Sequence, residues 1–331
     1  MMDENSFKLY AGDGTTIDRR NLRLPLFEKF GKLDNPEHYL AERGLRDAVN
    51  VALALGQPLL VTGEPGTGKT QLAASIAYEL GLGPPLVFNV KTTSTAKDLF
   101  YRYDALRHFH DAQFHKTELT VDPYVTYEAL GLAILLSADS READPYLPEP
   151  CRGKGPVRSV VLIDEIDKAP RDLPNDVLNE IENMSFEVKE TGRRFGADQR
   201  LRPILVLTSN SEKNLPDAFV RRCVFYHISF PDRERLREIV QRRLDLDSTF
   251  TPQMLENALR DFERIRSLPL RKKPATAEFL AWLEVLQRMK VDVDNLKPGQ
   301  AEAVAFSYCI LAKSKDDLAL LQKSLVERPV A

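Results

Sequence analysis

The chain has 331 residues, with 43% hydrophobic and 29% charged side chains and a formal net charge of −3 at pH 7. This composition is ordinary for globular domains, which excludes fibrous and disordered chains, and the length allows two domains. The 46 basic residues nearly balance the 49 acidic ones, which argues against a strongly basic protein built to bind nucleic acid.

Signals for membrane insertion or secretion are not evident in the sequence. No apolar run approaches the roughly 18 residues that a membrane-spanning helix needs, and the first ten residues, MMDENSFKLY, are polar and acidic. The cysteines Cys151, Cys223 and Cys309 are far apart and form no C-x-x-C pair, so neither a disulfide framework nor a zinc site is encoded. We therefore expect a cytoplasmic protein without a membrane span.

The first part of the chain predicts an irregular arm followed by an α/β domain. Residues 1–36 are polar and interrupted by glycine and proline, which indicates irregular structure. Over 37–231, short apolar runs typical of buried parallel strands alternate with helical patterns, and this alternation predicts a three-layer sandwich. The expected strands are 59–61, 86–90, 160–163 and 204–208, and the expected helices include 39–55, 69–80 and 173–184.

Two segments of this domain do not follow the simple alternation, and the chain changes character after it. A polar, aromatic-containing segment leads into an amphipathic helical pattern over 124–137, so we expect an insertion over about 101–137. FEVKETGRR indicates a hairpin, placed at about 186–203. After Pro231 the strand patterns stop, which predicts an all-α lid domain over 232–331. Its expected helices are 232–244, 252–267, 276–289 and 299–326, the last broken near Ser314.

The segment GEPGTGKT matches the phosphate-binding pattern G-x-x-x-x-G-K-[ST] in full. Its glycines let the backbone surround a phosphate with N–H groups, and the helix that begins at Lys69 adds its N-terminal dipole. Lys69 is expected to reach the β- and γ-phosphates, and the Thr70 hydroxyl to bind Mg²⁺. The predicted nucleotide-binding residues are Gly63, Glu64, Pro65, Gly66, Thr67, Gly68, Lys69 and Thr70.

Acidic and polar residues follow two of the predicted strands. The strand over 160–163 leads into Asp164, whose carboxylate at the edge of the sheet would hold Mg²⁺, directly or through water. The adjacent Glu165 is the natural base or positioner for an attacking water molecule. A second strand leads into Thr208, Ser209 and Asn210. Each of the three could orient that water against the γ-phosphate, and Asn210 is the preferred candidate.

These motifs resemble those of AAA+ ATPases and, within that class, the MoxR-like family, over roughly Tyr39 to Leu286. The resemblance implies a P-loop NTPase sandwich with a helical lid, hydrolysis of ATP with Mg²⁺, and assembly into a homo-oligomeric ring, hexameric in the family. In the family, an insert in the second helix and a hairpin that faces the ring pore occupy the places of 101–137 and 186–194. The resemblance rests on GQPLLVTGEPGTGKT (56–70), VVLIDEIDKAP (160–170), LVLTSN (205–210) and LPDAFVRRCVFYHISFP (215–231).

The resemblance also implies individual roles. Asn210 falls on the sensor-1 position. Arg222 aligns best with the family's arginine finger, with Arg221 as the alternative, and such a finger would reach the nucleotide of a neighbouring subunit. The family's sensor-2 arginine would fall on Ala275, so sensor 2 is either absent or replaced by a nearby cation. The candidate replacements are Arg271, Lys272 and Lys273.

The cations of the predicted hairpin segment have two alternative interpretations. They either line a pore or bind an acidic partner, or they are solvated charges on an exposed hairpin. These cations are Lys189, Arg193, Arg194, Arg200 and Arg202.

The leading hypothesis is a ring-forming ATPase that remodels a separately encoded partner, and the resemblance suggests partners that contain a von Willebrand A domain. A nucleic-acid motor or clamp-loader-like ATPase is the alternative. The near-neutral charge, the lack of an appended DNA-binding module and a lid with 18 basic against 16 acidic residues argue against it. A nucleotide switch or small-molecule kinase is a third class. The missing N-K-x-D motif and the Asp164–Glu165 pair, which suits water activation, argue against that class.

Overall fold

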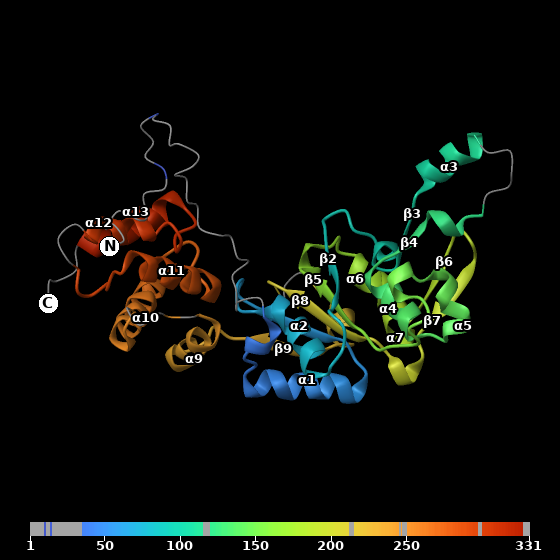
Figure 1. Cartoon of the computed structure of the whole chain (residues 1–331), viewed down its shortest axis with the longest axis horizontal. Coiled ribbons are helices and arrows are strands. Elements are labelled where there is room, and N and C mark those ends of the chain that lie inside the picture. The colour runs from blue at the N-terminus through green and yellow to red at the C-terminus, as the bar shows by residue number, and fades with distance from the viewer. Residues whose placement is uncertain are drawn as a thin grey trace. The chain divides into compact units, whose positions relative to one another are not determined.

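The computed structural model divides into two compact units, Tyr39–Ser229 and a second unit that continues from Phe230 (Figure 1). The predicted arm over 1–36 lies outside the described residues, apart from Tyr10, Gly14, Asn35 and Pro36. The structure describes residues 10, 14, 35–114, 120–211, 215–244, 246, 250–296 and 300–326.

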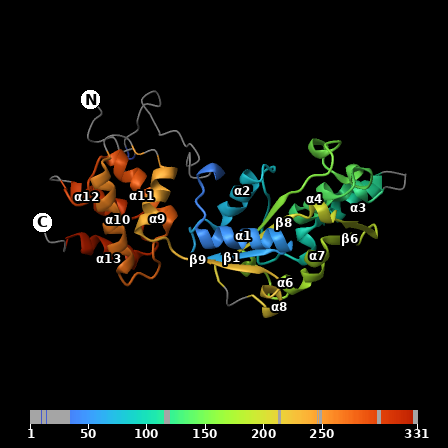
Figure 2. The ribbon, with the colours of Figure 1, turned by 90° about the horizontal axis from the view of Figure 1, so that it is seen from below.

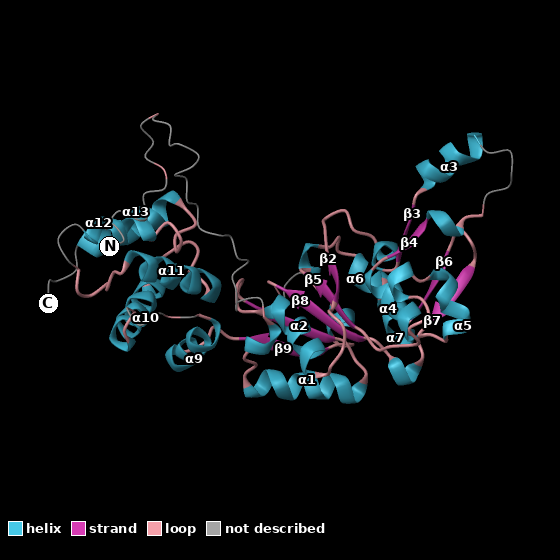
Figure 3. Cartoon of the chain, in the orientation of Figure 1, coloured by secondary structure: helices cyan, strands magenta, loops and turns pink. Residues whose placement is uncertain are grey.

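A five-stranded parallel sheet in the order β2-β5-β8-β1-β9 forms the centre of the first unit (Figure 3). Apolar runs account for its interior strands, since β1 is buried along its whole length and β5 along all but its last residue. The edge strand β9 was not among the expected strands. The sheet consists of β1 (Leu59–Gly63), β2 (Leu86–Asn89), β5 (Val160–Asp164), β8 (Ile204–Ser209) and β9 (Val224–Ile228).

Alternation of side chains along the strands creates two cores, one on each face of the sheet. Leu59 and Val61 belong to the core that α1 and α2 cover, whereas Leu60 belongs to the core on the opposite face. This second face carries α4, α6, α7 and α8, so the unit is the predicted three-layer αβα sandwich. The helices are α1 (Arg43–Leu55), α2 (Lys69–Glu79), α4 (Ala129–Ser137), α6 (Leu173–Asp176), α7 (Leu178–Asn183) and α8 (Asp217–Val220).

The expected continuous helix over 173–184 is two short helices, α6 and α7. The chain leaves helical geometry at Val177, which has φ −99° and ψ 0° and separates the two. Both helices contribute to the same core. The described residues also form these short elements: α5 (Ser140–Ala143) and the 3₁₀ turns Pro36–His38, Ala96–Leu99, Asp122–Tyr124, Asp144–Tyr146, Glu149–Cys151, Ile166–Lys168 and Gln199–Leu201.

The segment over 101–137 forms a ribbon and two helices. Strands β3 (Tyr101–Tyr103) and β4 (Val125–Tyr127) pair antiparallel, and α3 (Ala105–Phe114), which has no buried residue, extends from them (Figure 1). The amphipathic helix expected over 124–137 was wrong in two respects. Residues 125–127 form β4, and α4 is buried on most sides because it packs against β2 and β5 of the sheet and against the strand Arg193–Gly196 (β7).

A second antiparallel hairpin, β6 (Ser185–Val188) with β7 (Arg193–Gly196), packs against this ribbon. Aromatic rings join the two: Phe186 stacks on Phe100 with centroids 5.2 Å apart, and Phe195 meets Tyr127 edge-on at 5.7 Å. Ring pairs at such distances add stability beyond that of their buried area alone. The ribbon and the hairpin therefore share one apolar cluster.

The second unit is helical, and its helices gather in one bundle in both views (Figures 1 and 2). Trp282 is fully buried at its centre, and its indole Nε1 donates to Ser307 Oγ at 2.8 Å. The last two helices are separated around Ser314, where the break was expected. Among the described helices of the whole chain, none has the length and apolarity needed to cross a membrane. The bundle contains α9 (Arg233–Arg243), α10 (Pro252–Ser267), α11 (Thr276–Met289), α12 (Gln300–Ser307) and α13 (Lys315–Val326).

Candidate functional site

The loop between β1 and α2 carries the predicted phosphate motif. Its glycines adopt positive φ angles, 146° at Gly63, 77° at Gly66 and 87° at Gly68, which side chains with a Cβ rarely tolerate. A Cβ on Gly63 would lie 2.6 Å from the carbonyl oxygen of Ile228, so this position also requires glycine for space. The loop leads directly into the N-terminus of α2, and this combination of turn and helix dipole is suited to bind a phosphate group.

Lys69 is buried within this loop. Its Nζ donates to the carbonyl oxygens of Gly63 and Glu64, both at 2.9 Å. Burial lowers the pKa of Lys69, while the carboxylates at the end of β5 act in the opposite direction and raise it. The ammonium group therefore lies on the loop with oxygen partners that phosphate oxygens can replace.

Thr70 and Asp164 come together at the carboxyl edge of the sheet. The Thr70 hydroxyl donates to the two carboxylate oxygens of Asp164, at 3.1 and 3.2 Å. Hydroxyl and carboxylate oxygens are the hard ligands that Mg²⁺ prefers. This pair, next to the phosphate loop, fits the expected magnesium ion.

Thr208 connects the two acidic residues that follow the strand. Its hydroxyl donates to Asp164 Oδ1 and accepts the backbone N–H of Glu165 at 2.9 Å, and the residue is 1% exposed. Thr208 was considered as a residue that orients water, but its hydroxyl contacts the predicted magnesium ligand instead. The Ser209 hydroxyl donates to the Ser211 carbonyl at 2.6 Å, within its own loop.

Glu165 and Asn210, which the sequence predicted to cooperate, are in contact. The Asn210 side-chain amide donates to Glu165 Oε1 at 3.3 Å, and its backbone N–H donates to Asp167 Oδ1 at 3.1 Å. Lys168 forms an ion pair with Glu165 Oε2. Asp167 and Lys168 were not among the site residues predicted from the sequence. The three-residue spacing between Glu165 and Lys168 was the available signal, because side chains three apart align in a 3₁₀ turn.

Arg221 and Arg222 lie at the amino ends of the parallel strands, whereas the phosphate loop lies at their carboxyl ends. They precede β9, which runs parallel to β1 with Val224 beside Leu59, whereas the phosphate loop follows the far end of β1. A five-residue strand spans about 16 Å. The structure therefore does not bring these arginines together with Lys69 of the same chain.

The chain matches the family model of a known domain. The family model of the AAA domain (dynein-related subfamily) matches residues 58–223 of the chain. The chain belongs to this AAA family. A comparison with curated proteins finds no match. The matched range begins just before β1 and ends just after Arg222. Membership supports an ATP-binding protein of the AAA+ ATPase class, whose members typically use Mg²⁺ and form rings.

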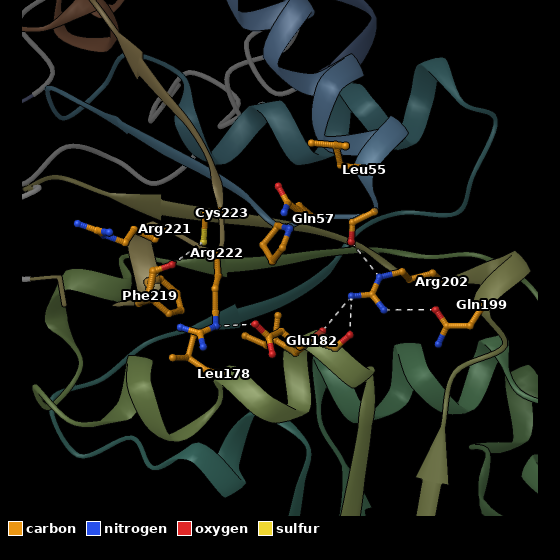
Figure 4. Close-up of a pocket in the computed structure, with 13 residues that line it drawn as sticks. Leu55, Gln57, Leu178, Glu182, Gln199, Arg202, Phe219, Arg221, Arg222 and Cys223 are labelled. Carbon is orange, nitrogen blue, oxygen red and sulfur yellow. Dashed lines mark hydrogen bonds and ion pairs between the residues drawn. The ribbon is translucent and has the colours of Figure 1, made fainter. Parts of the chain in front are cut away.

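The two arginines of this AAA domain border a pocket of about 420 Å³ (Figure 4). Arg222 points toward α7, where its Nε pairs with the Glu182 carboxylate, and its Nη1 donates to the Ala218 carbonyl at 3.0 Å. Arg221 points away from this pair. On the other side of the pocket, Arg202 donates to backbone carbonyls, including those of Gly56 at 2.9 Å and Glu182 at 3.0 Å.

Several cations of the predicted basic hairpin have partners within the AAA domain. Arg193 pairs with Asp122, and Arg194 pairs with Glu187 at 2.7 Å. Arg202, as described, bonds backbone carbonyls. These three side chains are therefore engaged within the chain rather than left as free charges for an acidic partner.

The candidate sensor-2 cations belong to the helical unit. The Arg271 guanidinium pairs with Asp316 at 2.7 Å, and both side chains are largely exposed. Backbone N–H groups of Arg271 and Lys272 donate to Asp317, at 2.9 and 3.4 Å. Whether one of these cations acts as sensor 2 or the function is absent stays a matter of prediction.

Proposed function

We propose that the chain hydrolyses ATP with Mg²⁺ as a MoxR-like AAA+ protein, assembles into a ring and remodels a separately encoded partner protein. The observation that carries the proposal is the contact of Glu165 with Asn210 beside the Thr70–Asp164 pair. A water activator, a water-orienting amide and a magnesium site adjoin one phosphate loop, as phosphoryl transfer to water requires.

The chain's own residues would divide the work as follows. Lys69 and the loop N–H groups bind the β- and γ-phosphates, and Thr70 with Asp164 holds the magnesium ion. When bound, Mg²⁺ neutralises charge that develops on the phosphate oxygens. Glu165 orients the attacking water and accepts its proton, while Asn210 contributes a hydrogen bond near the γ-phosphate.

The finger role belongs in this proposal to Arg222, with Arg221 as the alternative. An arginine at the far edge of the sheet from its own phosphate loop is suited to act on a neighbour's nucleotide. The preference for Arg222 over Arg221 rests on the resemblance, and its guanidinium would have to leave Glu182 and the Ala218 carbonyl of its own chain to reach a neighbour's nucleotide.

The ring, its size and the partner rest on the family resemblance. The ring is hexameric in that family, and a partner with a von Willebrand A domain is the favoured candidate. We also propose that residues 37–231 form the nucleotide core and 232–331 the lid. The near-neutral chain argues for a protein partner rather than nucleic acid.

Replacement of Glu165 by Gln tests the proposal. The amide retains the size of the side chain but cannot accept a proton, so Glu165→Gln binds ATP with unchanged affinity and turns over about 10²-fold more slowly. Phosphate release and binding of a fluorescent ATP analogue measure the two quantities. Glu142→Gln, an exposed position on α5, is the matched control and retains full activity. Turnover near the wild-type rate in Glu165→Gln would contradict the proposal.

A further inference from the structure

We propose that Lys168 is a positioning residue for ATP hydrolysis, which holds the Glu165 carboxylate in the orientation that directs water. This inference rests on the proposed function of Glu165. It assigns to Lys168, which lies outside the phosphate loop and the magnesium site, a share in the rate of the chemical step.

The backbone places the two side chains beside each other. Strand β5 ends at Asp164, and Glu165 adopts a positive φ of 58°, which turns the chain into the 3₁₀ turn Ile166–Lys168. The Lys168 N–H donates to the Glu165 carbonyl at 2.9 Å and closes this turn. Ile166, 1% exposed, anchors it in the core. Because residues three apart align in a 3₁₀ turn, the Lys168 ammonium meets the Glu165 carboxylate.

The carboxylate is held from both sides. Lys168 pairs with Oε2, and the Asn210 amide donates to Oε1 at 3.3 Å. Asp167, a member of the same turn, accepts the backbone N–H of Asn210 at 3.1 Å and so ties the two holders together. Lys168 is a cation at neutral pH, and the hydrogen bond to Glu165 raises its pKa further. One carboxylate orientation is thereby selected from those that free rotation would allow.

This arrangement affects rate more than folding. The side chains of Lys168 and Glu165 are 50% and 38% exposed, and ion pairs this accessible to water add little to folding stability. Misplacement of a catalytic group, in contrast, costs a large factor in rate, since orientation is part of the barrier. Loss of Lys168 is therefore expected to lower kcat while the protein remains folded.

The first experiment separates kcat from binding. Lys168→Ala lowers kcat roughly 10-fold, with KM for ATP and affinity for an ATP analogue within about twofold of wild type. Lys168→Arg, which retains a cation that can bond the carboxylate, recovers most of the lost rate. Lys168→Met retains the aliphatic stem without the charge. It replaces the alanine variant in the kinetic comparison if Lys168→Ala melts at a lower temperature than the wild type.

Arg152→Ala is the matched control. It removes an ion pair of the same spacing, Arg152 with Glu149 at 2.8 Å, beside another 3₁₀ turn outside the predicted site, and with it the hydrogen bonds of Arg152 to two backbone carbonyls. We expect this variant to hydrolyse ATP at the wild-type rate. A loss equal to that of Lys168→Ala would mean that any such pair affects the enzyme through stability alone, and would overturn the inference.

A double-mutant cycle tests whether Lys168 acts through Glu165. In single-turnover assays on a Glu165→Ala background, adding Lys168→Ala produces no further loss, because the group that Lys168 orients is already absent. The same 10-fold loss in both backgrounds, or a wild-type kcat in the single variant, would overturn the inference and leave the proposed function intact. Wild-type turnover in Glu165→Gln would instead overturn the proposed function, and the role of Lys168 with it.

Discussion

Thr208 illustrates how one hydroxyl group can bond two neighbouring acidic residues, the carboxylate of the first and the backbone of the second. It lies on β8, beside β5, where it donates to Asp164 and accepts the backbone N–H of Glu165. Groups that bond a metal ligand from behind fix its orientation and contribute to metal affinity. Thr208 is therefore expected to influence the magnesium site without contacting the ion.

Thr208→Val tests this role at the scale of a single side chain. Valine preserves the shape but can neither donate to Asp164 nor accept from Glu165, so the Mg²⁺ concentration for half-maximal ATPase activity rises about 10-fold. Thr208→Ser retains the hydroxyl and is the control, with a magnesium dependence close to wild type. Titration of activity with Mg²⁺ at saturating ATP measures both. An unchanged magnesium dependence in Thr208→Val would show that the Asp164 orientation does not depend on this bond.

At the scale of elements, α4 depends on a close approach to a neighbouring turn. A Cβ on Gly131 would lie 2.0 Å from the carbonyl oxygen of Phe100, a backbone atom that cannot rotate away. The same contact brings the helix beside the aromatic cluster of the ribbon and the hairpin. Gly131 therefore sets the distance between α4 and these elements.

Gly131→Ala is expected to lower the free energy of unfolding by about 3 kcal/mol, because the added methyl group displaces the helix or the turn. Gly83→Ala is the matched control. A Cβ on Gly83 meets nothing within 4 Å, so its substitution changes stability by less than about 1 kcal/mol. Urea denaturation followed by circular dichroism measures both variants. Equal stability of the two would contradict the close packing of α4.

The sequence predicted elements well where burial is uniform and poorly where tertiary contacts decide. Interior strands such as β1 and β5 are continuous apolar runs, so they were predicted close to their observed bounds. Strand β9 contains Tyr226 and His227 and lies at the edge of the sheet. Its residues alternate between half-buried and exposed before the buried Ile228, so it is not a continuous apolar run. The segment over 124–137 was expected to be an amphipathic helix with one exposed face. No local sequence pattern shows that the β6–β7 hairpin packs against α4.

The candidate site follows the same division. Thr70 and Asp164 belong to motifs whose spacing and strand context suffice to predict that they meet. The pair of Arg222 with Glu182 joins residues 40 positions apart, and only the folded chain brings them together. The contact of Lys168 with Glu165 is local in sequence. Its prediction would have required recognition of a 3₁₀ turn, a structure with a weak sequence signal.

At the scale of the whole molecule, the proposed catalytic residues lie at opposite ends of the parallel strands of one sheet. Glu165 follows the carboxyl end of β5, whereas Arg222 precedes the amino end of β9, and these strands belong to one parallel sheet. Under the proposed function, one chain would present two half-sites at opposite ends of these strands. Complete sites would then require a second copy, which would link activity to assembly.

Mixing two inactive variants tests this arrangement. Arg222→Ala lacks the finger but retains Glu165, and Glu165→Gln lacks the base but retains the finger. In randomly mixed rings roughly a quarter of the interfaces combine the intact halves, so activity returns on mixing. A mixture of Lys69→Ala with Glu165→Gln is the control, because both changes damage the same half and no interface is restored. Absence of recovery in the first mixture would place the finger elsewhere or exclude a shared site.

The buried position of Trp282 has an optical consequence. It is the only tryptophan of the chain, and it lies in the helical unit with its indole held by Ser307. Tryptophan emission therefore originates from the helical unit alone, whereas most of the tyrosines belong to the unit with the phosphate loop. Selective excitation of the indole thus provides a built-in spectroscopic label for one unit, without any added dye.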